Sequence, residues 1–203
     1  MKDIPKKRRL SRAEAKEKTR EALLEAAKTV FAQHGYYGAS LDKVAEVAGY
    51  TKGAVYANFS NKEELYLALL DKHLEVDTGD FEKFIISGAS SESLNDEFLS
   101  ESFVEEINNE RDWALLTLEF IIHAMRNDEI REKLANRIRL VIDNYKVCVE
   151  KRIASNGKEL PMSPEQTAIA LMTLTNGFGL LGMIETTSEM PKAYERILKL
   201  ILG

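Results

Sequence analysis

The chain has 203 residues, of which 44% are hydrophobic and 4 are proline, so it can bury a substantial core in one or two domains. Its formal net charge is -5, and its single cysteine, Cys148, excludes an intrachain disulfide and a cysteine metal cluster within one chain. The first residues are polar and basic with no apolar segment behind them. This is not the pattern of a signal peptide, and we expect a cytoplasmic protein.

The charge is unevenly distributed along the chain. Residues 1–62 hold 13 lysines and arginines against 7 acidic residues, a balance of +6, whereas the remaining 141 residues hold 15 against 26, a balance of -11. A basic first third on an acidic body is typical of proteins that present one end to phosphates, although charge runs are more often solvated surfaces. The run from Lys6 to Arg9 fits a flexible arm, residues 1–10, that follows DNA, or alternatively a nuclear localisation signal.

Residues 11–60 have the pattern of a three-helix domain. A long helix from Ser11 to His34 carries an apolar stripe and ends at Gly35. Ser40 is a favourable N-cap for a second helix that stops at Gly49, and Thr51 is a favourable N-cap for a third. The second and third helices, joined by a tight turn, form a helix-turn-helix.

The third helix, Lys52 to Asn58, has the composition of a recognition helix. Its inward positions are Val55 and Phe59, and its outward side chains are small or polar. Small residues let a helix backbone approach base edges in a major groove about 12 Å wide. The sequence therefore predicts a DNA-binding protein.

The segment from Ala27 to Leu70, including SLDKVAEVAG and TKGAVYANFSNKEELYLALL, resembles the DNA-binding domain of the tetracycline-repressor (TetR) family. We expect Thr51 and Lys52 nearest base edges. The resemblance implies that Tyr56 contacts a phosphate and that Lys62 acts with the positive end of a fourth helix on another. The candidate DNA-binding residues are Tyr36, Ser40, Thr51, Lys52, Gly53, Tyr56 and Lys62. The alternatives are a core tyrosine at 56 and an ordinary exposed lysine at 62.

Residues 61–203 are predicted to be helical almost throughout. A fourth helix opens with a Ser60–Glu63 capping box, and Ser163-Pro164-Glu165-Gln166 opens another. The predicted segments are 60–84, 92–108, 111–126, 128–155, one beginning at Ser163, and 191–202. With the first three helices, this gives an all-α fold of about nine helices and no strand.

The segment Gly177 to Gly182 matches the G-x-G-x-x-G pattern of dinucleotide-binding loops, but it lies inside a helical pattern with no strand before it. A nicotinamide-dependent enzyme is therefore kept only as an alternative. The three histidines, His34, His73 and His123, lack the spacing of a zinc site, and no catalytic motif appears. We expect no enzyme, cofactor, metal or membrane span.

The last two predicted helices are expected to form a dimer interface, as the resemblance implies. Their apolar stripes need a partner, and two recognition helices about 34 to 36 Å apart would read a palindrome. The alternative is that both helices are core of a monomer. The candidate interface residues are Ala168, Leu171, Thr175, Phe178, Gly179, Gly182, Met183, Tyr194, Ile197, Leu198 and Ile201.

The resemblance also implies a cavity for a small effector among the middle helices. Candidate lining residues, large and apolar or amphipathic, are Phe103, Trp113, Phe120, His123, Tyr145 and Met172. An apolar or aromatic effector would release the DNA. The predicted function is a ligand-responsive transcriptional regulator, most often a repressor in this family, that binds a palindromic double-stranded DNA operator as a homodimer. A helical protein-interaction scaffold without DNA binding is the other alternative.

Overall fold

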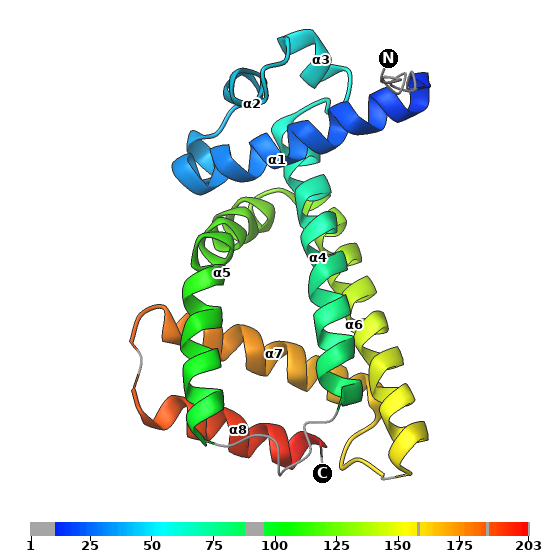
Figure 1. The fold of residues 1–203 in the computed structure, drawn as a ribbon, viewed down its shortest axis with the longest axis vertical. Helices are drawn as coiled ribbons and strands as arrows, with labels where there is room; N and C mark the ends of the chain where they lie inside the picture. The colour runs from blue at the N-terminus through cyan, green and yellow to red at the C-terminus, as the bar shows by residue number, and fades with distance from the viewer. Residues whose placement is uncertain (1–10, 88–95, 158, 186, 203) are drawn as a thin grey trace, which may run out of the picture. The chain divides into compact units, whose positions relative to one another are not determined.

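A computed structural model describes residues 11–87, 96–157, 159–185 and 187–202, with side chains left undescribed at 75–78, 80, 83, 84, 86, 87, 96–110 and 156. Within these ranges the fold is all-α, with eight helices and no strand (Figure 1). The helices are α1 (Arg12–Gly38), α2 (Leu41–Ala48), α3 (Lys52–Tyr56), α4 (Lys62–Ser87), α5 (Asp96–Met125), α6 (Asp128–Asn156), α7 (Pro164–Gly182) and α8 (Glu189–Leu202). None of the described helices is long and apolar enough to cross a membrane. The arm at 1–10 lies outside the described residues.

The helix count differs from the expected nine because two predicted segments form one helix. The break expected at Asn108–Asn109 is absent, and α5 runs through it from Asp96 to Met125. Asparagine in a helix interior costs at most about 0.7 kcal/mol relative to alanine, which packing readily offsets, whereas proline or glycine would have cost more.

The chain divides into two compact units, Met1–Leu69 and Leu70–Gly203, and the division falls within α4. The sequence-based division at residue 60 places the boundary earlier, at the start of that helix. We call the two parts the first unit and the second unit. Each is described separately below.

Short-range signals set the helix boundaries of the first unit. Ser11 and Glu14 form a reciprocal capping box at the start of α1, and regular helical geometry is interrupted at Gly35, which has φ 64°. Gly49 ends α2 with φ 69°, in the left-handed region that glycine enters without strain. The start of α4 differs by one residue from the expectation. The Asn61 Oδ1 atom, and not Ser60, accepts the N–H of Glu64 at 2.8 Å.

The core of the first unit joins all of its helices. Leu23, Ala27, Val30 and Phe31 of α1 are at most 1% exposed, as the apolar stripe predicted. Other buried residues are Val44 and Ala45 of α2, Val55 of α3, Phe59 before α4, and Leu65, Tyr66 and Leu69 of α4. The recognition helix is therefore held by contacts on its inner face, and its outer face stays free of packing.

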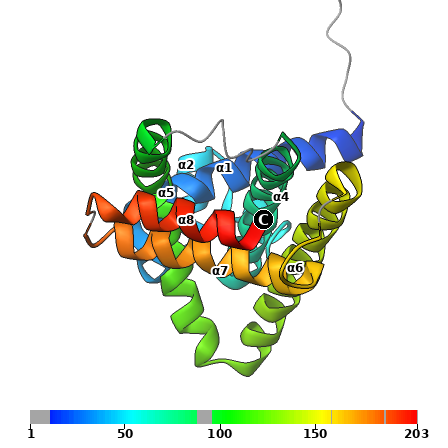
Figure 2. The same ribbon diagram turned by 90° about the horizontal axis from the view of Figure 1, so that it is seen from below.

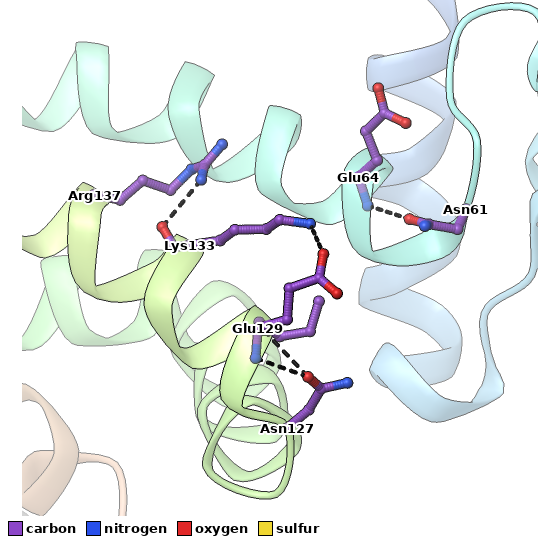
Figure 3. Close-up of polar contacts among 7 residues, drawn as sticks. Asn61, Glu64, Asn127, Glu129, Lys133 and Arg137 are labelled. Carbon is purple, nitrogen blue, oxygen red and sulfur yellow. Dashed lines mark hydrogen bonds and ion pairs between the residues drawn. The ribbon is translucent and has the colours of Figure 1, made fainter.

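In the second unit α6 and α7 also begin at side-chain caps. The Asn127 Oδ1 atom accepts the N–H groups of Glu129 and Ile130 at the start of α6, and farther along the helix an Nη1 N–H of Arg137 donates to the carbonyl of Lys133 (Figure 3). The same figure shows the Asn61–Glu64 cap of the first unit. Ser163 and Gln166 form the predicted capping box of α7, and Gly157 ends α6 with φ 67°.

The core of the second unit has two described clusters. One gathers Ile85, Cys148, Val149, Leu171, Leu198, Ile201 and Leu202 from α4, α6, α7 and α8. The other contains Val141, Tyr145 and Ala168, with Leu74, Phe81, Ile142 and Met172 around them. Helix α7 contacts α5, α6 and α8, and α7 and α8 lie side by side (Figure 2). Helix α7 is thus central to the second unit.

Candidate nucleic-acid interface

The outer face of α3 is exposed as predicted. Val55 and Phe59 are 0% exposed, whereas Lys52, Gly53, Tyr56 and Ala57 face solvent, with Tyr56 at 55%. The Thr51 hydroxyl accepts the N–H of Ala54 at 3.2 Å and so caps the helix. On this face Lys52 contributes an ammonium and Tyr56 contributes a phenol. At Gly53 there is no side chain between the helix backbone and an approaching ligand.

A shallow concave surface adjoins this face. It encloses about 400 Å³ and is lined by Ala39, Ser40, Leu41, Asp42, Tyr56, Ser60, Asn61 and Lys62. Two helices begin in this surface. The Ser40 hydroxyl accepts the N–H of Lys43 at 3.3 Å at the start of α2, and Asn61 caps the start of α4. Helix N-termini carry partial positive charge, and two of them at one surface favour an anion.

Lys52 is paired with an acidic residue that sequence reasoning missed. Its Nζ atom lies 2.6 Å from Oδ2 of Asp42 in the first turn of α2. The hydrogen bond to Asp42 raises the pKa of Lys52 above its ordinary value, so Lys52 is charged at neutral pH. Residues 42 and 52 are ten positions apart in the sequence. No local motif predicts that their side chains pair, because the pairing depends on how α2 and α3 pack.

Lys62 has different partners from the phosphate that the resemblance implies. Its Nζ atom donates to the carbonyl oxygens of Tyr36, Tyr37 and Ala39 at 2.7, 3.4 and 3.3 Å. It also lies 4.5 Å from the centre of the Tyr36 ring. An ammonium has three N–H donors, and these carbonyls match that number. The phosphate contact stays a prediction, and the structure gives the ammonium an internal role.

Tyr36 is a core residue, which does not fit a DNA backbone contact by its side chain. It is 1% exposed and packs against Phe31, Tyr37 and Tyr66 with ring centroids 5.5 to 6.2 Å apart. Burial, followed by the nearby carboxylate of Glu63, raises the pKa of the Tyr36 hydroxyl well above its ordinary value. Aromatic residues are enriched in cores as well as at interfaces, so the sequence pattern alone did not separate these roles.

Five of the eleven residues predicted for a dimer interface are buried within the protomer. Ala168, Leu171, Leu198 and Ile201 are at most 8% exposed and pack in the clusters of their own protomer, and Gly182 is also buried. Phe178 and Tyr194 pack against each other, and the Tyr194 hydroxyl lies 3.1 Å from the Thr175 hydroxyl. Gly179, Met183 and Tyr194 are half-buried, and Thr175 and Ile197 are exposed.

An apolar face that the sequence reasoning did not select remains uncovered. Ile169 and Leu180 of α7 are 41% and 39% exposed, Ile184 in the turn after α7 is 78% exposed, and Leu200 of α8 is 69% exposed. Gly177 lies between the first two of these, and a Cβ atom added to it would meet nothing within 4 Å. The helical spacing of 169, 173, 177 and 180 could have identified this face, since both faces of α7 are apolar.

The candidate effector residues fall into two groups within the second unit. Trp113 packs against His73 of α4 with ring centroids 4.1 Å apart, and Phe120, which is 0% exposed, lies one turn before His123. Tyr145 stacks on Phe81 at 3.6 Å, and Met172 packs against the same cluster. The side chain of Phe103 lies outside the described residues. His73 and Phe81 contact these candidate residues, but the sequence analysis did not select them as lining residues.

The glycine-rich segment lies inside a helix. Gly177 and Gly179 belong to α7, and the described glycines with positive φ are Gly35, Gly49 and Gly157. A dinucleotide-binding loop requires a turn between a strand and a new helix, which this backbone lacks. Among the described residues no group of three or more His, Cys, Asp or Glu side chains could hold a metal ion.

Comparison with known proteins identifies the family. Residues 23–69 match the family model for bacterial regulatory proteins of the tetR family. The chain is 29% identical to the uncharacterized HTH-type transcriptional regulator YfiR of Bacillus subtilis over 83% of this chain and 80% of that protein. It is 43% identical to the HTH-type transcriptional activator FasR of Mycolicibacterium smegmatis over 60 residues, covering 30% of this chain and 27% of that protein.

Solved structures with the same fold cover most of the chain. Salmonella enterica GusR aligns with a TM-score of 0.68 at 20% identity, over 92% of this chain and 96% of GusR. The transcriptional regulator FadR of Bacillus subtilis, solved in complex with stearoyl-CoA, aligns with a TM-score of 0.62 at 18% identity, over 90% and 97%. The chain belongs to the TetR family of helix-turn-helix transcriptional regulators. The family is one of transcriptional regulators.

Proposed function

We propose that this regulator binds a palindromic DNA operator as a homodimer, and that a small effector bound by the second unit releases it. In this role it acts as a repressor and works in the cytoplasm, where bacterial DNA lies. The observation that carries the proposal is the gathering of the exposed face of α3 and the capped N-termini of α2 and α4 on one surface.

The residues of that surface have different roles. Lys52 reaches base edges, with Thr51 beside it, and Gly53 lets the α3 backbone approach the groove. The Tyr56 hydroxyl and the Ser40 cap contact phosphates, where the positive ends of α2 and α4 add to the attraction. Lys62 acts by positioning α4 against the end of α1.

The homodimer is proposed to form through exposed apolar residues of α7, of the turn after it and of α8, namely Ile169, Leu180, Ile184 and Leu200, with Gly177 between the first two. A glycine in the middle of such a face lets two helices approach closely. Large exposed apolar patches are characteristic of interfaces, and a two-fold dimer presents two recognition helices to the two halves of a palindrome.

The effector is proposed to be apolar or aromatic. The ring pairs Trp113–His73 and Tyr145–Phe81, with Phe120 and Met172, supply apolar and aromatic surface in the second unit. FadR, which has the same fold, was solved in complex with stearoyl-CoA, a small molecule with a long apolar chain. Release requires that the effector prefer one conformation, and a coupling of about 1 to 3 kcal/mol would change operator binding about 5- to 150-fold.

Selection of bound fragments from genomic DNA by the purified full-length chain tests the proposal. We expect a palindrome to be recovered, and its affinity to fall steeply with salt. Lys52→Gln, which removes a proposed base-edge contact, should weaken binding to the palindrome by about 1 to 3 kcal/mol and relax its sequence preference, whereas Lys28→Gln, on the exposed side of α1, should leave both near the wild-type values. A monomeric protein that retains no fragment at low salt would contradict the proposal and leave the scaffold alternative.

A further inference from the structure

Asp42 places a carboxylate on the surface that is proposed to face DNA. It lines the concave surface together with Tyr56 and Asn61, and its side chain is 50% exposed. A carboxylate repels phosphates, so a surface built only for affinity would not carry one at this position. The residue therefore needs a separate explanation.

The partner of Asp42 is the recognition-helix lysine. The Oδ2 atom of Asp42 lies 2.6 Å from the Nζ atom of Lys52, whose side chain is 68% exposed. The pair bridges α2 and α3 and draws the ammonium toward α2. The ammoniums of Lys43 and Lys62 instead bond to backbone carbonyls, of Gly38 in the first case and of Tyr36, Tyr37 and Ala39 in the second.

Stability alone is a weak explanation for this pair. Ion pairs between exposed side chains contribute little to folding because solvent and salt screen them. An acidic residue in the first turn of α2 interacts favourably with the positive helix end, but that effect does not require Lys52 as a partner. The pair is weak enough to be broken by a better acceptor and strong enough to orient the ammonium in its absence.

We propose that Asp42 is a specificity-determining residue that competes with DNA for Lys52. On unrelated DNA the ammonium stays with Asp42 and is not available to neutralise a phosphate. On the operator, base acceptors in the major groove, such as O6 and N7 of guanine, replace the carboxylate as the partner of Lys52. Asp42 thus weakens binding to wrong sites more than binding to the right one, and specificity is the difference between these two affinities.

The inference rests on the proposed function and is tested with four full-length proteins: wild type, Asp42→Asn, Lys52→Gln and the double variant. The two probes are the selected operator fragment and a fragment of the same length and scrambled sequence, and binding is measured by fluorescence anisotropy over a range of salt concentrations. Asp42→Asn should tighten binding to the scrambled fragment by about 3- to 10-fold and steepen its log-log salt slope by up to about 0.9. Operator affinity should change by less than about 2-fold, so the specificity ratio falls.

The double variant separates action through Lys52 from other effects of the charge. If Asp42 acts by holding Lys52, Asp42→Asn should have no effect on scrambled DNA in the Lys52→Gln background. An equal effect in both backgrounds would mean direct repulsion or a change in α2, and would overturn the proposal. The matched control is Glu129→Gln, which removes an exposed carboxylate paired with Lys133 in the second unit and should leave the specificity ratio unchanged.

The outcomes also distinguish this inference from the function on which it rests. A wild-type protein that binds neither fragment overturns both. A wild-type protein that prefers the operator, with the same preference in Asp42→Asn, overturns only the role of Asp42. Circular dichroism melting of each variant verifies that the helices remain folded, and a loss of the specificity ratio without a change in melting supports the proposal.

Discussion

The ammonium of Lys62 lies 2.7 Å from the carbonyl oxygen of Tyr36, joining the first turn of α4 to the last turn of α1. The carbonyls at a helix C-terminus lack intrahelical partners and carry partial negative charge, so a lysine is well suited to bind them. The contact fixes the start of α4 beside the concave surface that adjoins α3. Lys62 therefore stabilises the packing of α4 against α1, which supports the helix-turn-helix.

Lys62→Met is expected to lower the stability of the first unit by about 1 to 2 kcal/mol, because it removes charge-assisted hydrogen bonds to carbonyls. Thermal unfolding followed by circular dichroism measures this change, with Lys28→Met as the exposed-lysine control. The log-log salt slope of operator binding should stay near that of the wild type. A slope reduced by about 0.9 with unchanged stability would instead make Lys62 a phosphate ligand.

Gly49→Ala is expected to destabilise the first unit by about 1 kcal/mol, because alanine is strained in the left-handed conformation that Gly49 adopts. A Cβ atom at this position would meet nothing within 4 Å, so the cost comes from the backbone and not from a clash. Gly49→Asn should cost less, since asparagine tolerates this conformation. Urea unfolding of the three proteins gives the order, and equal stability of all three would contradict it.

Features that depend on neighbouring residues were predictable from the sequence. The capping box at Ser163 and the stop at Gly49 depend on three or four consecutive residues, and both form. The inward positions Val55 and Phe59 follow from helical spacing alone. The start of α4 shifted by one residue because Ser60 and Asn61 are both good caps.

Features that depend on packing between helices were not predictable in the same way. Helix α7 is apolar on two faces, and spacing alone does not tell which face the protomer buries, so Leu171 and not Leu180 was assigned to the interface. The partners of Lys52 and Lys62 come from other helices. Tyr36 has the amphipathic side chain of an interface residue, but its position against Phe31 buries it.

The stability of the first unit is expected to decline above about pH 10, where Tyr36 contributes to the loss. Burial and Glu63 raise the pKa of its hydroxyl in the folded state, so the folded protein keeps a proton that an unfolded tyrosine loses near pH 10. This contribution is full below the unfolded pKa and is lost as pH rises toward the folded one. Melting temperatures at about pH 8 and about pH 10.5 measure it. Tyr36→Phe should lose less stability than wild type over this interval, and an identical loss would contradict the assignment.

Trp113 is the only tryptophan, so its emission reports on one place in the second unit. Its ring packs against His73 with centroids 4.1 Å apart. An effector that inserts among the candidate lining residues should change the intensity or wavelength of this emission. The measurement is a fluorescence titration with each compound that releases the operator fragment. A compound that releases DNA without altering the emission would place the effector site away from Trp113.

Leu180→Glu is expected to convert the proposed dimer into monomers, because a buried unpaired carboxylate at a helix interface is strongly unfavourable. Leu180 is 39% exposed on α7 and lies one turn from the open Gly177 position. The matched control is Leu140→Glu on α6, where the leucine is 62% exposed and lies outside the proposed interface. Sedimentation velocity should give a dimer for wild type and Leu140→Glu and a monomer for Leu180→Glu. Because a single recognition helix reads too few bases, the monomer should also lose operator binding by at least about 100-fold, given that each lost half-site removes several kcal/mol. A dimeric Leu180→Glu protein with intact operator binding would rule out this face as the interface.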